Sequence, residues 1–239
     1  TSLPQGIFQS TTSLQTVILP PALQMIGSYA FQYCSSLSSI DLPETVTEIG
    51  SQAFDACTAL QTITFPANLE EIDQYAFRNT GLTEVTLPEN LTTLGSYAFS
   101  KSTSLKSACL NKKIDYTRSF DYFSGCSALE TLRIYAGSVP NTSGSYMGFR
   151  TNCVLEVPMG TESLYQAADV WKEFKEINGF LTGDKLAAGD YAVLRDMYES
   201  LNGTEWTKQW DLTTDDRYPG KWYGVTTEEM AAAFSAFVN

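Results

Sequence analysis

The side chains that most often carry out chemistry in proteins are missing from this chain or lie in patterns that fit a surface. None of the 239 residues is histidine, which excludes Ser-His-Asp and Cys-His triads and histidine ligands to zinc or haem. The densest acidic run is Glu70, Glu71 and Asp73, and the second is Asp215 with Asp216. Glycoside hydrolysis needs two carboxyl groups roughly 5 to 10 Å apart across a cleft. Because one of each adjacent pair points away from the other, we interpret both runs as solvated surface.

Metal, phosphate and disulfide sites are not predicted either. Asp211, Asp215 and Asp216 could supply oxygen ligands to calcium, but the loop spacing of a calcium site is missing. No glycine-rich phosphate-binding motif occurs. The five cysteines form an odd set without Cys-x-x-Cys, which favours neither a dense disulfide framework nor a four-cysteine zinc site. The sequence therefore predicts no catalytic residue, no metal and no cofactor.

The charge of the chain narrows the choice of partner. There are 15 Lys and Arg residues against 27 Asp and Glu residues, so the formal net charge is −12. This sign disfavours phosphate backbones and anionic membrane surfaces. The longest apolar runs, such as Ala231 to Phe234, fall far short of the ~20 residues of a membrane span. We expect a folded chain that neither binds nucleic acid nor spans a membrane.

Two ladders of apolar residues predict the elements that position these side chains. A leucine recurs every 22 to 24 residues, and a phenylalanine recurs in step with it, five or six residues ahead. A repeat of this length is typical of a solenoid, in which each coil buries its apolar face only against its neighbours. The ladders consist of Leu14, Leu37, Leu60, Leu82, Leu105 and Leu129, and of Phe8, Phe31, Phe54, Phe77, Phe99 and Phe123.

The repeat over residues 37–60 indicates what each coil contains. Ile40 and Leu42 alternate with polar residues, which predicts a short strand buried on one side and, from coil to coil, a parallel sheet. Val46 and Ile49 are expected to point inward from the opposite wall. In the next segment a small alanine lets a turn of helix approach the sheet, while Phe54 fills the space between coils.

The pattern Leu-x-x-Ile-x-Leu-Pro, Val-x-x-Ile-Gly, Ala-Phe-x-x-Cys-x-x-Leu of residues 37–60 resembles the BspA-like class of leucine-rich repeats in bacterial surface proteins. The resemblance covers residues 1–178. It implies an α/β leucine-rich-repeat solenoid of about six repeats. The parallel sheet would line the concave face, with short strands and helical turns on the convex wall. It also implies a capping helix over 162–177, whose Trp171 and Phe174 would close the open end of the core.

Two repeats depart from this pattern. In the repeat that contains Phe123, Asn111 replaces the proline and Tyr122 replaces the alanine, so we expect the wall to bulge there. In the following repeat, residues 136–148 are rich in glycine and are interpreted as an extended loop.

The cysteines at the repeat positions are expected to be buried, free thiols. Cys34, Cys57 and Cys126 each lie three residues before a ladder leucine, where a small side chain packs inside the coil. Cys34 and Cys57 occupy the same place in adjacent coils. The strand spacing of roughly 5 Å leaves a disulfide between them as the alternative in an oxidising compartment.

A second module is expected after the repeats. The period disappears after Gly179, so we expect a linker over 179–189 and a small helical, Trp-rich module over 190–239. Residues 190–225 resemble the N-terminal cap of plant-type leucine-rich repeats, which implies a further array downstream. The residues that follow show no such array, and Leu3–Ser13 aligns with only the second half of a repeat. The chain is therefore expected to be a fragment, or to carry a cap that has lost its array.

The outward residues of the predicted strands form the candidate binding face, because solenoids bind partners on their extended concave surfaces. The alternative is a merely solvated sheet face, since hydroxyl residues favour strands. The candidate residues are Ser39, Asp41, Thr62, Thr64, Glu84, Thr86, Ser107 and Arg133.

With the resemblance, this face predicts a non-catalytic, secreted or surface protein that mediates protein-protein interaction or adhesion through the face or the 136–148 loop. The partner would be a protein of a host or of a neighbouring bacterial surface. The resemblance implies an extracellular or outer cell-surface location. A lipid anchor on a segment that precedes Thr1 is one means of attachment.

Two other functions stay open. A glycan-binding module of a carbohydrate-acquisition system would use exposed tyrosines or tryptophans to stack on sugars, although the tyrosine rings could instead cover core edges. The tyrosines concerned are Tyr29, Tyr33, Tyr75 and Tyr97. An enzyme would need a cleft with converging carboxylates.

Overall fold

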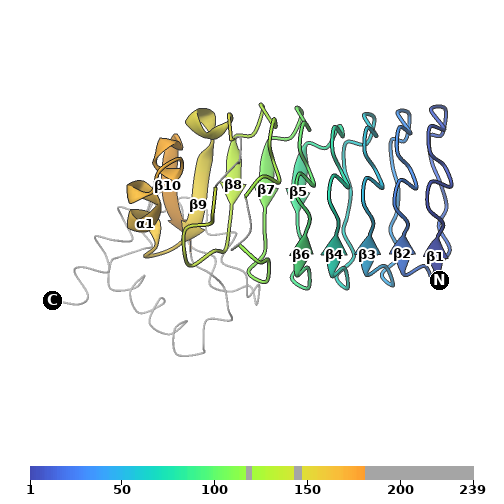
Figure 1. The fold of residues 1–239 in the computed structure, drawn as a ribbon, viewed down its shortest axis with the longest axis horizontal. Helices are drawn as coiled ribbons and strands as arrows, with labels where there is room; N and C mark the ends of the chain where they lie inside the picture. The colour runs from blue at the N-terminus through green and yellow to red at the C-terminus, as the bar shows by residue number, and fades with distance from the viewer. Residues whose placement is uncertain (117–119, 143–146, 181–239) are drawn as a thin grey trace, which may run out of the picture. The chain divides into compact units, whose positions relative to one another are not determined.

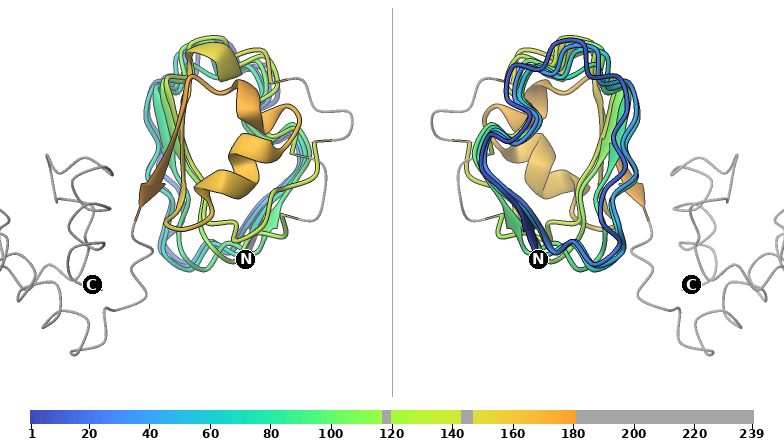
Figure 2. Two further views of the ribbon diagram at one scale, coloured as in Figure 1. Left: turned by 90° about the vertical axis from the view of Figure 1, so that its left-hand side faces the viewer. Right: turned by 90° about the vertical axis from the view of Figure 1, so that its right-hand side faces the viewer.

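The computed structural model describes residues 1–116, 120–142 and 147–180. The unit Thr1–Asn178 is a row of stacked coils (Figure 1). Viewed along the row, the coils nearly superimpose (Figure 2). The predicted leucine-rich-repeat solenoid is confirmed. Residues 181–239, with most of the predicted linker over 179–189 and all of the predicted module over 190–239, lie outside the described part of the chain.

One wall of the stack is a parallel sheet of two-residue strands. The repeat predicted that this wall points apolar side chains inward. Ile26, Ile49 and Ile72 do so: they are aligned in the register of the sheet and are fully buried. Each preceding residue points outward and is half-buried. The strands, in sheet order, are β1 (Ser2–Leu3), β2 (Met25–Ile26), β3 (Glu48–Ile49), β4 (Glu71–Ile72) and β6 (Thr93–Leu94).

A second sheet runs along the wall where the main parallel sheet was predicted. Val85, Ala108, Leu132 and Leu155 are aligned in its register and buried. The strands, in sheet order, are β10 (Glu176–Phe180), β9 (Val154–Pro158), β8 (Thr131–Arg133), β7 (Ser107–Cys109) and β5 (Glu84–Thr86).

This second sheet is shorter than predicted. The segments 16–19, 39–42 and 62–65 keep the alternation of buried and exposed side chains but form no hydrogen-bonded ladder. A proline follows each of them and also follows β5, whereas Asn111 and Tyr135 stand near the ends of β7 and β8. Proline lacks an N–H to donate to a neighbouring coil, but β5 pairs with β7 although a proline follows it, so proline alone does not decide where the second sheet ends.

The wall segments that carry the ladder phenylalanines are runs of turns. Tyr29 and Tyr33 adopt left-handed backbone angles (φ 60° and 61°), which interrupt a right-handed helix. Their N–H groups donate to carbonyls of the next coil, at Ser51 (2.9 Å) and Asp55 (2.8 Å). Turns replace the predicted helical turn because a helix would use these N–H groups within one coil, whereas stacking needs them between coils.

The phenylalanine ladder is the centre of the core, as predicted. Consecutive rings stack with centroids 5.0 to 5.7 Å apart and planes within 15° of parallel. Phe54, in the middle of the stack, is fully buried between Phe31 and Phe77.

The repeat-position cysteines are free and buried, as predicted, and no disulfide joins Cys34 to Cys57. The Cys57 thiol donates a hydrogen bond to the carbonyl of Phe31 in the preceding coil (3.1 Å). Ser102 occupies the equivalent place and donates to the Phe77 carbonyl (3.2 Å). Burial raises the pKa of the Cys57 thiol far above its ordinary value, so this group is a structural donor rather than a nucleophile.

Asn111, which stands where other repeats have proline, joins its coil to the preceding one by side-chain hydrogen bonds. Its side-chain amide donates to the carbonyls of Pro88 and Leu91 in the preceding coil, and its oxygen accepts the N–H of Lys113 (2.8 Å). Tyr122, the other departure in this repeat, is buried. The first sheet stops at β6, one coil earlier, so the wall is irregular here; residues 117–119, where a bulge would lie, are outside the described residues.

The predicted loop over 136–148 is irregular where it is described. Residues 136–142 and 147–148 contain no helix or strand, and residues 143–146 are outside the described ranges.

The C-terminal cap is not the single helix predicted over 162–177. It consists of α1 (Glu162–Ala167), the 3-10 turn η2 (Trp171–Glu173) and β10. Val170 has φ 71°, which breaks the helix. Leu164, in α1, is 50% exposed. Within the described ranges no helix is long and apolar enough to cross a membrane.

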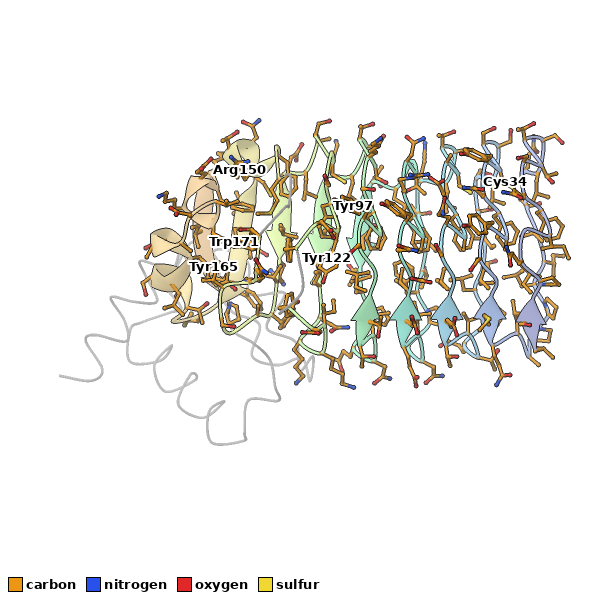
Figure 3. The ribbon with its side chains drawn as sticks, viewed as in Figure 1. Cys34, Tyr97, Tyr122, Arg150, Tyr165 and Trp171 are labelled. Atoms are coloured by element: carbon orange, nitrogen blue, oxygen red, sulfur yellow. The ribbon has the colours of Figure 1, made fainter. Side chains whose placement is uncertain are left out.

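The cap nevertheless closes the core with the predicted aromatic side chains. Trp171 is 1% exposed, stacks on Phe174 with centroids 5.6 Å apart, and lies edge-on to Tyr165 at 5.4 Å (Figure 3). The Trp171 indole N–H donates to the Pro140 carbonyl (3.2 Å), and the Tyr165 hydroxyl donates to the Ala136 carbonyl (2.9 Å). These bonds satisfy buried polar groups of the irregular segment before the cap.

The outward side of the first sheet carries two carboxylates that repel each other. Glu48 and Glu71 are partners in the register of β3 and β4. Burial, with repulsion from Glu48 and Asp73, raises the pKa of Glu71 above its ordinary value. The charged form of Glu71 is therefore disfavoured in the folded state.

Replacing Phe54 with alanine should lower the free energy of unfolding by about 3 to 5 kcal/mol, because the change opens a cavity between two stacked rings. Urea denaturation of the full chain measures this loss. Thr64→Ala, on the exposed side of the next coil, is the control. A loss below about 1 kcal/mol would show that the ladder is not core.

Cys57→Ser should be more stable than Cys57→Ala by about 1 kcal/mol, because serine keeps the donor to the Phe31 carbonyl, as Ser102 does in its own coil. Thermal denaturation under reducing conditions measures the difference. If the alanine variant equals or exceeds the serine variant, the hydrogen bond contributes nothing.

Glu71→Gln should raise the free energy of unfolding at pH 7 by a few tenths of a kcal/mol, since it removes one of two like charges on adjacent strands. A raised pKa in the folded state means that the penalty is present at neutral pH. It disappears below the ordinary carboxyl pKa, so variant and parent should converge below about pH 4. Denaturation across this pH range measures the convergence. Glu48→Gln should give a similar gain, and the double variant less than the sum; additive gains would contradict the pairing.

Candidate functional site

The predicted binding face is the outward side of the second-sheet wall, called the strand face below. Most of it is open to solvent. Six candidates are exposed, whereas Ser107 and Arg133 are half-buried. The exposed candidates are Ser39, Asp41, Thr62, Thr64, Glu84 and Thr86.

The register of the second sheet decides which candidates meet. Glu84 lies directly beside Ser107. Thr86 and Arg133 belong to one row, but Cys109 stands between them. The structure therefore brings the first pair together and separates the second.

Arg133 is engaged in an ion pair that the sequence analysis did not predict. Its Nε donates to Glu156 Oε2 across adjacent strands at 2.6 Å. Partial burial lowers the pKa of Arg133, but the hydrogen bond and the charge of Glu156 more than offset this effect. Opposite charges 23 residues apart in the repeat are the signal that could have revealed the pair.

Cys109 is the half-buried thiol of the strand face. Burial raises its pKa, and the nearby charge of Arg133 only partly opposes that effect. The thiol is therefore protonated at neutral pH and is not poised as a nucleophile.

The acidic run from the sequence is not part of the strand face. Glu71 lies in β4, in the first sheet. An open hollow near this sheet is lined by Gln24, Thr45, Thr47, Asn68 and Glu70, among others. Several of these side chains bond to the backbone of the preceding coil; Thr45 Oγ1, for example, donates to the Leu23 carbonyl (2.6 Å). In the described residues, no group of three or more Asp, Glu or Cys side chains is placed to hold a metal ion.

Two of the four wall tyrosines turn a ring face toward a neighbouring side chain and not toward solvent. Tyr75 and Tyr97 stack on each other with centroids 5.4 Å apart and planes 7° from parallel. The guanidinium carbon of Arg78 lies 4.9 Å from the Tyr75 centroid. The ring faces are thus turned toward neighbouring side chains, and only Tyr33, 47% exposed, stands out from the wall.

The polar network beside these tyrosines was also missed by the sequence analysis. Arg78 donates from Nε and Nη2 to Asp55 (2.8 and 2.6 Å), and Asp55 is only 1% exposed. Gln32 Nε2 donates to the same carboxylate (3.0 Å). The signal was available, because Gln9, Gln32, Asp55 and Arg78 each follow a ladder phenylalanine.

Comparison with solved structures identifies bacterial relatives. A leucine-rich repeat protein from Bacteroides ovatus is 26% identical, with a TM-score of 0.55 over 75% of this chain and 41% of that one. The T. pallidum leucine-rich repeat protein TpLRR is 28% identical, with a TM-score of 0.52 over 72% of this chain and 73% of that one. The pneumococcal vaccine antigen PcpA shares the fold at 22% identity, with a TM-score of 0.61 over 72% of this chain and 43% of that one. The chain thus spans less than half the length of the Bacteroides ovatus protein and of PcpA.

No curated protein matches the chain. A family model described as a BspA type leucine-rich repeat region matches residues 1–130 in six copies. These copies cover the coils whose phenylalanines, thiols and turns stack in register. The chain belongs to the BspA-type leucine-rich repeat family.

Proposed function

We propose that this chain is a non-catalytic interaction module of a secreted or surface-exposed protein, which binds another protein through the strand face. One observation carries the proposal. The strand face is an open wall of exposed hydroxyl and carboxylate side chains, while the apolar ladders and the repeat-position thiols beneath it are buried.

The stacking supports binding because it holds these side chains in place before a partner arrives. Equivalent residues of adjacent coils repeat at roughly the 4.8 Å spacing of strands. Little conformational freedom is then lost on binding, which favours affinity. The hydroxyls of Thr62 and Thr64 both donate and accept hydrogen bonds, while Asp41 and Glu84 only accept. Such a surface suits a polar protein segment.

The proposed location is extracellular or at the outer cell surface. It is supported by membership of a repeat family that occurs in bacterial surface proteins. Attachment through a lipid anchor on an N-terminal segment is part of the same proposal.

Glycan binding is the weaker alternative. It would need exposed aromatic faces, and the rings of Tyr75 and Tyr97 are stacked on each other. Catalysis is weaker still, because the strand face has no histidine, its Cys109 thiol is protonated, and Glu156 is paired with Arg133.

The strand face can be tested with a phage-displayed library of random dodecapeptides, selected against the full chain. Peptides that bind the face should lose at least tenfold in affinity with the double variant Thr62→Arg, Thr64→Arg, because two long cations block the surface. Thr92→Arg, an exposed threonine outside the strand face, should bind as the parent does. A glycan array is measured in parallel.

Binding that is unchanged in the double variant would contradict a role for the strand face. A signal on the glycan array that the double variant abolishes, without enriched peptides, would replace the protein partner with a sugar.

A further inference from the structure

The strand face consists of two halves that differ in their backbone hydrogen bonds. From β5 through β7 and β8 to β9, adjacent coils are joined along this wall by a parallel ladder. The preceding segments of the same wall, 16–19, 39–42 and 62–65, form no strand, and in Figure 1 the coils before β5 carry only the arrows of the first sheet. We call these three segments the open half and the laddered strands the closed half.

One repeat position shows the difference directly. In the closed half, an inward residue of each coil donates its N–H to a carbonyl of the next coil at 2.9 to 3.0 Å. These donors are Leu87, Leu110 and Ile134. In the open half, the equivalent N–H groups of Leu19, Leu42 and Phe65 donate to no carbonyl within the described ranges. The position is the same in every coil, so the bond and not the register is what differs.

Side-chain packing differs in the same direction. At the inward position two residues earlier, Val85, Ala108 and Leu132 of the closed half are at most 2% exposed. Their three equivalents in the open half are all more exposed, and two of them, Val17 and Ile63, are only partly buried. Ile63 belongs to the third coil, so the looser packing is not confined to the end of the stack.

The other walls hold the coils of the open half in register. In the first-sheet wall, Gly50 donates its N–H to the Ile26 carbonyl (2.9 Å). In the turns, Phe54 donates its N–H to the Ala76 carbonyl (2.8 Å). A small approach of the coils on the third wall would therefore complete the ladder without changing the fold.

The repeat also identifies the acceptors that a completed ladder would use. Leu87 donates to the carbonyl of Cys109, the outward residue of the next coil. The corresponding acceptor is the carbonyl of Thr64 for Leu42 and the carbonyl of Thr86 for Phe65. Both threonines are candidate residues of the strand face, so closing the ladder would bring face residues of adjacent coils closer together.

The open half also carries most of the exposed candidate residues, namely Ser39, Asp41, Thr62 and Thr64. Segments with few backbone hydrogen bonds and loose packing open at low free energy, and binding surfaces are commonly such segments. The N–H groups that lack a carbonyl partner gain one when the ladder closes.

We propose that the open half of the strand face adapts to its partner, whereas the closed half is a fixed platform. A protein segment that lies across adjacent coils draws them together, and the N–H groups of Leu42 and Phe65 then pair with the carbonyls of Thr64 and Thr86. This inference rests on the proposed function, because it is the bound segment that favours the closed ladder. A segment that contacts two coils at once binds the closed arrangement more tightly, and this difference in affinity shifts the equilibrium.

Residue-resolved hydrogen exchange of the full chain, measured by NMR, tests the open half without a partner. Relative to their intrinsic rates, the amides of Leu42 and Phe65 should exchange at least about tenfold faster than that of Leu110. Gly50 and Phe54 are the matched controls, because they belong to the same coils and are hydrogen-bonded on the other walls. Their amides should exchange slowly.

The measurement is repeated with a saturating dodecapeptide whose affinity depends on Thr62 and Thr64. Exchange at Leu42 and Phe65 should slow at least about tenfold, while exchange at Leu110 stays nearly constant. The double variant Thr62→Arg, Thr64→Arg with the same peptide is the control, and its exchange should equal that of the free chain.

Three results would overturn the inference. Exchange at Leu42 and Phe65 as slow as at Leu110 in the free chain would show that the ladder is already closed. Equally fast exchange at Gly50 and Phe54 would show that whole coils are loose, and not one wall. Fast exchange that persists at Leu42 and Phe65 in the saturated complex would show that a partner does not close the ladder.

Failure of the proposed function is distinguishable from these results. A selection without peptides that depend on Thr62 and Thr64 would contradict the proposed function, and with it the closing step. Fast exchange at Leu42 and Phe65 in the free chain would in that case still show an open ladder. Peptides that depend on Thr62 and Thr64 but leave the exchange unchanged would support the proposed function and overturn only the adaptation.

Discussion

Equivalent residues of adjacent coils lie in register along both sheets and along the phenylalanine ladder, and this register determines how the solenoid packs. A residue type that recurs at one repeat position stabilises the stack only if its side chain packs well against the same side chain in the next coil, about 5 Å away. Phenylalanine meets this condition, and its rings stack at 5.0 to 5.7 Å along the core. Glutamate does not, and the adjacent Glu48 and Glu71 repel each other.

The same constraint explains why so many polar side chains are unavailable to a partner. A donor in one coil lies within reach of a carbonyl in the preceding coil, and several residue types use it. Cys57 donates to the Phe31 carbonyl, and Asn90 donates to the Ala67 carbonyl. These side chains join one coil to the next. Their recurrence at the repeat period therefore indicates a role in stacking and not in ligand binding.

Stacking places opposite charges of neighbouring coils close enough to form stabilising ion pairs, whereas it makes like charges repel each other. Arg78 with Asp55 and Arg133 with Glu156 each join residues 23 positions apart in the sequence. Neither pair needs a cleft, and both hold a cation rigidly at an otherwise regular wall. The strand face remains open to a partner and presents mainly hydroxyls and carboxylates.

The solenoid, its period and its core could be predicted from the amino-acid sequence, because each repeat shows the same alternation independently; Ile40, Phe54 and Cys57 were all placed from one repeat. The sequence also determined which residues line the strand face. The folded stack was needed to show how far the second sheet extends, that turns replace helix around Tyr33, and that the cap ends in β10. These features depend on bonds to a neighbouring coil, which offset local preferences such as the left-handed strain of Tyr33. For the same reason the chemistry of Arg78 was hidden in the sequence: it is set by Asp55, which is distant along the chain and adjacent only in the stack.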